Sequence, residues 1–153
     1  MSSWGNQVRR WWRQRREQDL TVRKLLIELD NGPELNSSRT QFLKRLVDFA
    51  DATGLEIELA YLPPYHSKYN PIERGWGFLE KHWNGALLAT IDTALKWTQS
   101  LVWRGVQTLV SEITGTYESG VTLTQTAMRA IHRRLQRHTT LPKWSLIIKP
   151  TSR

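Results

Sequence analysis

Cysteine is absent from this chain of 153 residues, and histidine is sparse. Without cysteine, disulfide bonds and thiolate zinc sites are excluded. The four histidines stand at positions 66, 82, 132 and 138, which is too scattered to predict an imidazole metal cluster. Any metal ion would therefore be held by carboxylates.

Long apolar runs and a signal segment are also missing. No stretch is long and apolar enough to cross a bilayer, and the N-terminus does not combine charged, apolar and small-residue regions. A cytoplasmic protein with no membrane partner is therefore predicted. The chain is 39% hydrophobic, which suffices for one domain with a core.

Acidic residues are unevenly distributed, and one end of the chain has none. Residues 119–153 hold seven Lys/Arg and no acid, while residues 1–24 hold seven Lys/Arg against two acids. Residues 25–118 hold eight bases and twelve acids, so the net charge of +8 comes from the flanks. This pattern is typical of a protein that binds a polyanion through the basic segments at both ends of the chain. Solvated basic helix faces are the alternative.

The periodicity of the apolar residues predicts an α/β fold. The near-continuous apolar run Leu25–Leu29 ends at Asp30, before a turn, and predicts a buried central strand. Apolar residues then recur at helical spacing up to Gly54. Residues 55–61 alternate between apolar and charged or small side chains, which indicates an edge strand. A strand, helix and strand of this length permit a parallel crossover.

The other elements are predicted to be mainly helical. A basic helix with adjacent tryptophans is expected over residues 7–20, and further helices over 91–103 and 124–138, before a short apolar end at 144–148. The predicted organisation is a single partial domain over 1–153, with a core at 24–85 and a helical C-terminal extension at 86–153.

Two acids are predicted to leave the same edge of the sheet. Asp30 ends the first strand, and the chain from the second strand passes through Pro63 to Glu73. In open parallel sheets, the carboxyl edge is where ligands bind.

Glu73 is expected in the first turn of a helix that Asn70 caps and Pro71 begins. The alternative to a metal ligand is a capping-box glutamate, whose carboxylate accepts a hydrogen bond from the backbone N–H of Asn70.

Three segments resemble transposases of bacterial insertion sequences: LDNGPE at 29–34, PPYHSKYNPIERGW at 63–76 and LEKHWNG at 79–85. The resemblance is to the DDE superfamily, to its mariner-like branch with an N-P-I-E helix start, and most closely to ISAzo-type members. The adjacent tryptophans at 11–12, the segment TQFLKRLVDFAD and the terminal LPKW also fit. The resemblance therefore covers nearly the whole chain.

This resemblance implies a ribonuclease-H-like core in which three acids hold two divalent metal ions, Mg²⁺ or Mn²⁺. Asp30 matches the second acid and Glu73 the third. Carboxylate oxygens suit these ions, and a metal pair stabilises both the attacking and the leaving oxygen. DNA hydrolysis would free a 3′-hydroxyl that attacks target DNA, with no covalent protein intermediate.

The first acid of the family has no match. In that fold it precedes the basic helix, and neither Asp19, Asp48 nor Asp51 occupies its position. The chain is therefore interpreted as the C-terminal part of a ribonuclease-H-like fold: two parallel strands with a crossover helix, then helices, with the N-terminal strands missing. We expect it to be inactive alone and to work with a missing N-terminal half or in a transposase oligomer. Its first strand would expose an apolar edge.

Five basic residues are predicted to contact DNA. They are Arg13 and Arg16 in the N-terminal basic segment, His66 and Lys68 in the loop before Glu73, and Arg74. For the loop residues, simple solvation is the alternative.

Three further residues on the helix of Glu73 are given structural roles. Trp76 and Trp83 share a face, which favours core packing. Glu80, on the face of Glu73, is interpreted as a surface salt-bridge partner rather than a residue that supports the metal site.

Two functions are weighed. The first is a DDE-type transposase, in which this chain is a truncated fragment of a metal-dependent DNA-cutting and joining enzyme. The second is a non-catalytic DNA-binding or regulatory remnant that uses the basic flanks alone. A gene remnant without selected activity is a third interpretation.

Overall fold

The computed structural model describes residues 3–18, 21–30, 39–63, 69–110, 112 and 122–151, with side chains of the first helix from Gln7 onward. The chain divides into two compact units. The first comprises Met1–Tyr65 and Thr116–Arg153, and the second comprises His66–Gly115. Each unit is described by itself.

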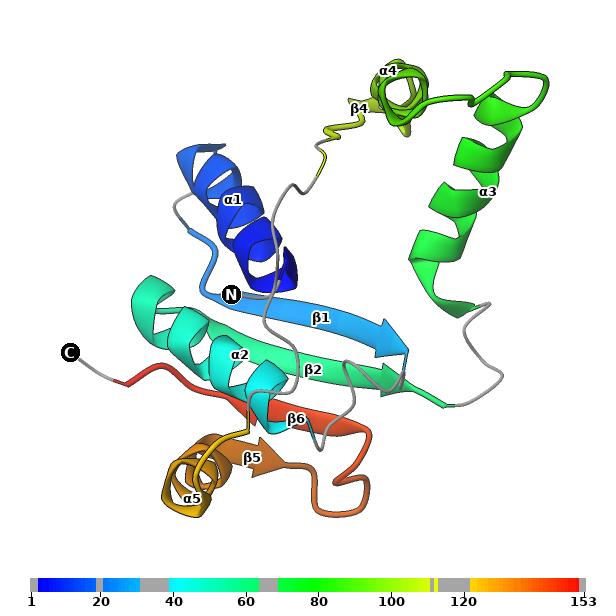
Figure 1. Ribbon diagram of the computed structural model, residues 1–153. Helices are drawn as coiled ribbons and strands as arrows, with labels where there is room; N and C mark the ends of the chain where they lie inside the picture. The colour runs from blue at the N-terminus through cyan, green and yellow to red at the C-terminus, as the bar shows by residue number, and fades with distance from the viewer. Residues whose placement is uncertain are drawn as a thin grey trace. The chain divides into compact units, whose positions relative to one another are not determined.

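The first unit is a four-stranded mixed sheet with helices (Figure 1). Its elements are α1 (Ser3–Gln18), β1 (Lys24–Asp30), α2 (Thr40–Thr53), β2 (Glu56–Leu62), α5 (Gln125–Arg134), β5 (Leu135–Arg137) and β6 (Ser145–Ile148). The strand order is β1-β2-β6-β5, with β1 and β2 parallel and the other pairs antiparallel. The predicted α/β class, with two parallel strands joined by a crossover helix, is confirmed.

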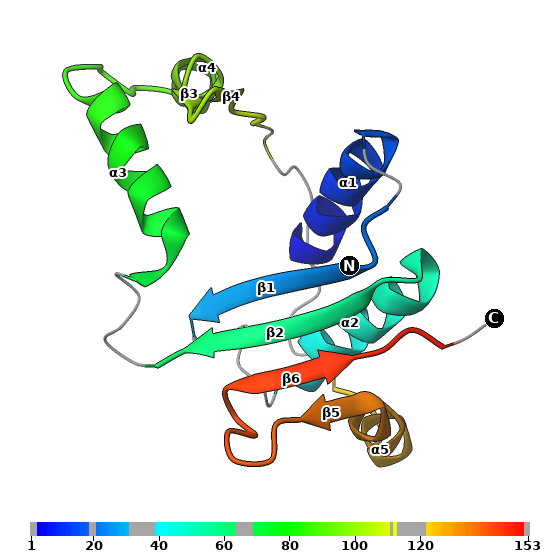
Figure 2. The same cartoon turned by 180° about the vertical axis from the view of Figure 1, so that it is seen from behind.

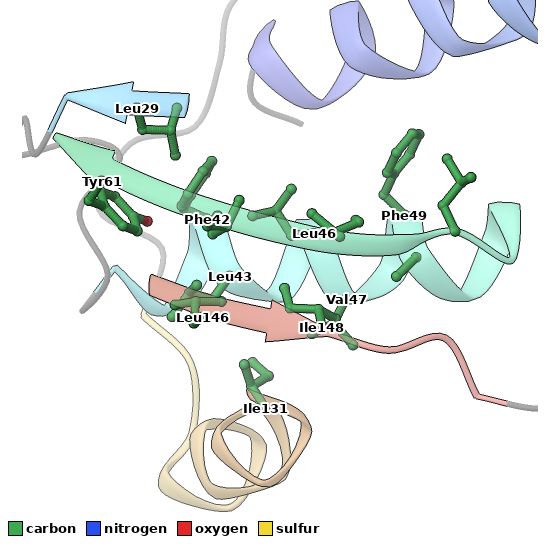
Figure 3. Close-up of a cluster of buried hydrophobic side chains, with 14 of the residues drawn as sticks. Leu29, Phe42, Leu43, Leu46, Val47, Phe49, Tyr61, Ile131, Leu146 and Ile148 are labelled. Atoms are coloured by element: carbon green, nitrogen blue, oxygen red, sulfur yellow. The ribbon is translucent and has the colours of Figure 1, made fainter. Parts of the chain in front are cut away.

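One face of the sheet carries the hydrophobic core. The apolar stripe of α2 packs on it, and Figure 3 shows the side chains of α2 meeting those of β6 and Ile131 of α5. The residues on α2 that are buried are Phe42, Leu43, Leu46, Val47, Phe49 and Ala50. Trp12 of α1 joins the same cluster. The sheet and α2 therefore share one continuous core.

Local signals set the end of α2. Gly54 follows the helix in the left-handed conformation, at φ 74°, and its N–H donates to the Ala50 carbonyl at 2.8 Å. A glycine reaches this conformation without the steric cost of a Cβ. The predicted stop at Gly54 is confirmed.

The opposite face of the sheet is open in the described part of the first unit (Figure 2). Side chains at alternate positions of β1 all point there and are exposed, including Leu26 at 53%. On the same face, Lys24 pairs with Glu58 at 2.6 Å and with Glu56 at 3.4 Å. The hydrogen bond that Lys24 donates to the Glu58 carboxylate raises the pKa of Lys24.

The prediction that the first parallel strand is central and the second lies at an edge of the sheet is wrong. Within the described residues, β1 lies at an edge of the sheet and pairs only with β2, whereas β2 lies between β1 and β6. The charged alternation of β2 reflects a sheet with only one helix-covered face, and it does not mark an edge. The predicted exposed apolar edge on the first strand agrees with this arrangement.

The residues after Gly85 are less helical than predicted. The helix expected over 124–138 ends at Arg134, and β5 follows at once. The apolar end of the chain forms β6, in which Ile148 pairs with Ile57 and is fully buried. Pairing with β2 satisfies the backbone of β6, so the C-terminal segment completes the sheet.

The second unit contains α3 (Pro71–Trp83), α4 (Ile91–Gln99), β3 (Val102–Trp103) and β4 (Val106–Gln107). His82 joins α3 to the end of α4, because its Nε2 lies 2.9 Å from the Trp97 carbonyl oxygen and 2.8 Å from Ser100 Oγ. The helix predicted over 91–103 ends at Gln99, and its last predicted residues form the first strand of a hairpin. In the described residues, no helix is long and apolar enough to span a bilayer.

Candidate active site

Asp30 is the last residue of β1 and pairs in register with Leu62, the last residue of β2. Because the strands are parallel, both carboxyl ends reach the same edge of the sheet, as predicted. Asp30 is exposed, and it has no hydrogen-bond or ion-pair partner among the residues that the structure describes. Its carboxylate is therefore available to a ligand.

Glu73 lies in the first turn of α3. The helix starts as predicted, since the Asn70 side chain accepts a hydrogen bond from the Ile72 N–H at 3.2 Å and Pro71 takes the first helical position. The Glu73 N–H donates to the Asn70 carbonyl oxygen at 3.0 Å. This backbone hydrogen bond and the cap fix the first turn of α3, and with it the point from which the Glu73 side chain projects.

The capping-box alternative for Glu73 is not formed. Both residues of such a box are described, yet no hydrogen bond joins the Asn70 N–H to the Glu73 carboxylate. The side chain is exposed, and within the described ranges it has no partner. Glu73 thus has no local structural role that would occupy its carboxylate.

The donor chemistry of Asp30 and Glu73 fits Mg²⁺ or Mn²⁺, because both offer exposed carboxylate oxygens. Among the described residues, no three histidine, aspartate or glutamate side chains form a cluster that could hold a metal ion. Asp30 belongs to the first unit and Glu73 to the second, so their convergence on a shared metal pair stays a prediction.

The other acids considered for the first position are engaged or lie outside the description. Asp48 pairs with Lys44 at 2.7 Å on α2. Asp51 accepts two hydrogen bonds from Arg134. Asp19 lies outside the described residues.

The predicted DNA contacts are partly located. Arg13 and Arg16 are exposed on α1, three residues apart, and Arg74 is exposed next to Glu73 on α3. His66 and Lys68 lie outside the described residues. No contact in the described structure tests these five assignments.

Two structural roles predicted on α3 are wrong. Trp76 is 54% exposed and does not pack in a core, whereas Trp83 is half-buried. Glu80 is exposed, and no salt bridge joins it to another described residue. The reason is that α3 has no fully buried residue at all, so a shared helix face does not imply core packing.

Sequence reasoning missed a feature of the second unit, the hairpin of β3 and β4. Its turn consists of Arg104 and Gly105, and the Arg104 guanidinium lies over the Trp103 ring at 5.1 Å from the ring centroid. The available signal was weak: Gly105 stands between two short β-prone segments, but arginine precedes it where a two-residue hairpin turn favours asparagine, aspartate or glycine.

Comparison with known families gives one match. A family model described as the Rhodopirellula transposase DDE domain matches residues 5–150. No curated protein and no solved structure matches the chain.

Proposed function

The chain belongs to the Rhodopirellula transposase DDE domain family, and we propose that Asp30 and Glu73 supply two of the three acids of its DNA-cutting and joining site. Transposases act on DNA, and DDE domains generally use divalent metal ions. The observation that carries the proposal is that both acids are free of partners among the described residues, one at the carboxyl end of β1 and one in the first turn of α3.

The chain's own residues would act by holding and orienting. Asn70 and Pro71 fix the start of α3, and this places the Glu73 carboxylate without a flexible linker. Asp30 is held by its pairing with β2. Divalent ions, when bound, would activate a water molecule and then a DNA 3′-hydroxyl as nucleophiles. The exposed Arg74 would keep the DNA backbone near Glu73.

We further propose that this chain is the C-terminal part of the catalytic domain, of the ISAzo type in the mariner-like branch. The acids of α2 support this, because Asp51 is held by Arg134 and Thr151, and Asp48 pairs with Lys44 on the surface of the crossover helix. The first acid would then come from a separate N-terminal half or from another transposase chain, and this chain alone would be inactive.

The test combines this chain with an N-terminal half that carries the missing aspartate. Mg²⁺-dependent cleavage of element ends should appear in the mixture. Glu73→Gln should lower it by about 100-fold or more, because the loss of one metal ligand removes several kcal/mol of charge stabilisation. Glu80→Gln, seven residues later and also exposed on α3, is the matched control and should cleave as the parent does. Full activity in Glu73→Gln would reject the assignment.

A non-catalytic DNA-binding remnant is the second candidate. It is favoured by the exposed arginines of α1, which need no metal ion to attract DNA. In that case DNA binding would fall with salt, and neither Mg²⁺ nor the double variant Asp30→Asn, Glu73→Gln would change it. Cleavage that appears when the N-terminal half is added would exclude this candidate.

A further inference from the structure

The turn of the β3–β4 hairpin contains a residue whose backbone conformation is unfavourable for its type. Trp103 pairs with Val106, so the turn has only two central residues, and both have positive φ: 51° at Arg104 and 77° at Gly105. This is the sign pattern of a type I′ turn, which favours asparagine, aspartate or glycine at its first central position. Arg104 is the only non-glycine residue with positive φ among the described residues. The hairpin therefore carries arginine at a position where backbone conformation disfavours it.

The guanidinium of Arg104 is placed by the neighbouring indole. It stands over the Trp103 ring, 5.1 Å from its centroid, within the range of a cation–π interaction. The ring is itself supported, since a methyl group on Gly75 of α3 would lie 3.7 Å from two of its atoms. Trp103 thus joins the hairpin to α3, the helix that carries Glu73.

Arg104 remains available to an external anion. In the described part of the chain, no carboxylate pairs with it and its guanidinium donates no hydrogen bond, so its N–H donors are unused there. The flanking Val102 and Val106 are 57% and 70% exposed, so the tip of the hairpin is open to solvent.

We infer that the β3–β4 hairpin is a DNA-contacting element in which Arg104 binds a backbone phosphate, with its guanidinium oriented by Trp103. A planar fork of donors suits a phosphate, and the cation–π contact with Trp103 restricts the side chain before it binds, which reduces the entropy lost on binding. The inference rests on the family's action on DNA, which makes DNA the polyanion to expect, and it does not depend on the metal ligands. The contact is assigned to phosphate and implies no base preference.

The test measures binding of the full chain to a labelled duplex between about 50 and 200 mM salt. Arg104→Gly removes the cation and also relieves the backbone, so its thermal stability should equal or exceed that of the parent. Its DNA affinity should nevertheless fall about three- to tenfold, and the slope of log K against log salt should shrink by about 0.9. Arg104→Lys should keep most of the slope, because it keeps the charge.

Lys96→Gln is the control for net charge, because Lys96 is exposed on α4 in the same unit, where it pairs with Asp92 at 3.1 Å, and its removal changes the net charge equally. Its slope should stay closer to that of the parent. The inference is overturned if Arg104→Gly binds DNA as the parent does, if Lys96→Gln loses as much as Arg104→Gly, or if the parent does not bind DNA. It is also overturned if Arg104→Gly weakens binding to poly-aspartate but not to DNA, which would assign the hairpin to an acidic protein. The carboxylates of Asp30 and Glu73 are intact in every variant, so outcomes that differ between the variants and the parent leave the proposed metal ligands untouched. Only a parent that does not bind DNA would count against the proposed function as well.

Discussion

Arg134 of α5 donates two hydrogen bonds to Asp51 of α2, from Nη1 to Oδ2 at 3.0 Å and from Nη2 to Oδ1 at 2.7 Å. The same guanidinium donates to the Lys149 carbonyl oxygen at 2.7 Å, and the Thr151 N–H and hydroxyl both donate to Asp51. The ion pair and its hydrogen bonds therefore join α2 to α5, which precedes β5, and to Lys149 and Thr151, which follow β6. It secures the C-terminal part of the sheet to the strand, helix and strand β1, α2 and β2 that precede it.

Asp51→Asn should destabilise the protein at neutral pH by about 1–2 kcal/mol, a modest figure because both side chains are about one-third exposed and water screens the pair. The Arg134 guanidinium holds the pKa of Asp51 well below its ordinary value of 3.8. The pair therefore stabilises the fold above that value, and its contribution is lost as the pH falls below it.

The measurement is urea unfolding of parent and variant at pH 7 and at successively lower pH. The difference in unfolding free energy should narrow below about pH 4. Asp48→Asn is the control on the same helix, where an exposed pair with Lys44 should contribute at most about 0.5 kcal/mol. A difference that widens on acidification would contradict the assignment.

Gly54→Ala should cost about 1 kcal/mol of stability. No atom lies within 4 Å of the added methyl group, so the cost comes from the positive φ alone. Gly77→Ala is the matched comparison, because its methyl group also meets nothing within 4 Å but stands inside α3 with ordinary φ. That change should stabilise α3 by about 0.5–1 kcal/mol. Thermal unfolding followed by circular dichroism compares them, and equal effects at both positions would refute the account.

Leu26→Lys should reduce self-association without unfolding the protein. Leu26 is 53% exposed on the open face of β1 and pairs in register with Glu58, so lysine there gains a favourable cross-strand charge. Light scattering after size-exclusion chromatography gives the oligomeric state. Leu29→Ala serves as the contrast, because Leu29 is buried in the core and its truncation should cost about 2–4 kcal/mol. An unchanged association state in Leu26→Lys would show that the open face of β1 around Leu26 is not the contact.

The double variant Arg13→Gln, Arg16→Gln should weaken DNA binding by the same factor whatever the sequence of the DNA. Both side chains are exposed on α1, and the loss of two phosphate contacts would reduce the salt slope by about 1.8. Salt-dependent fluorescence anisotropy with two unrelated duplexes measures this. Gln14→Ala, between the two arginines and also exposed, should leave the slope as it is.

Several features followed directly from the sequence because they depend on neighbouring residues only. Gly54 ends α2 through its own conformational freedom, and Asn70 with Pro71 starts α3 through one side-chain acceptor and one missing N–H. The apolar stripe from Phe42 to Ala50 predicted the face on which α2 packs. The candidate site residues Asp30 and Glu73 were predicted by motif; the structure places them at a strand end and a helix start, and their shared role stays a prediction.

The sequence by itself determined the α/β class, the parallel pair of strands and the local frame of each acid, because helix caps, turns and apolar periodicity act within a few residues. Only the tertiary structure decided that β2 is an inner strand, that the chain's end supplies β6, and that Arg134 meets Asp51. Each of these depends on which distant segment pairs with which, for example Ile57 with Ile148. Periodicity reports which face of a strand is covered and carries no information about which strand lies at its side.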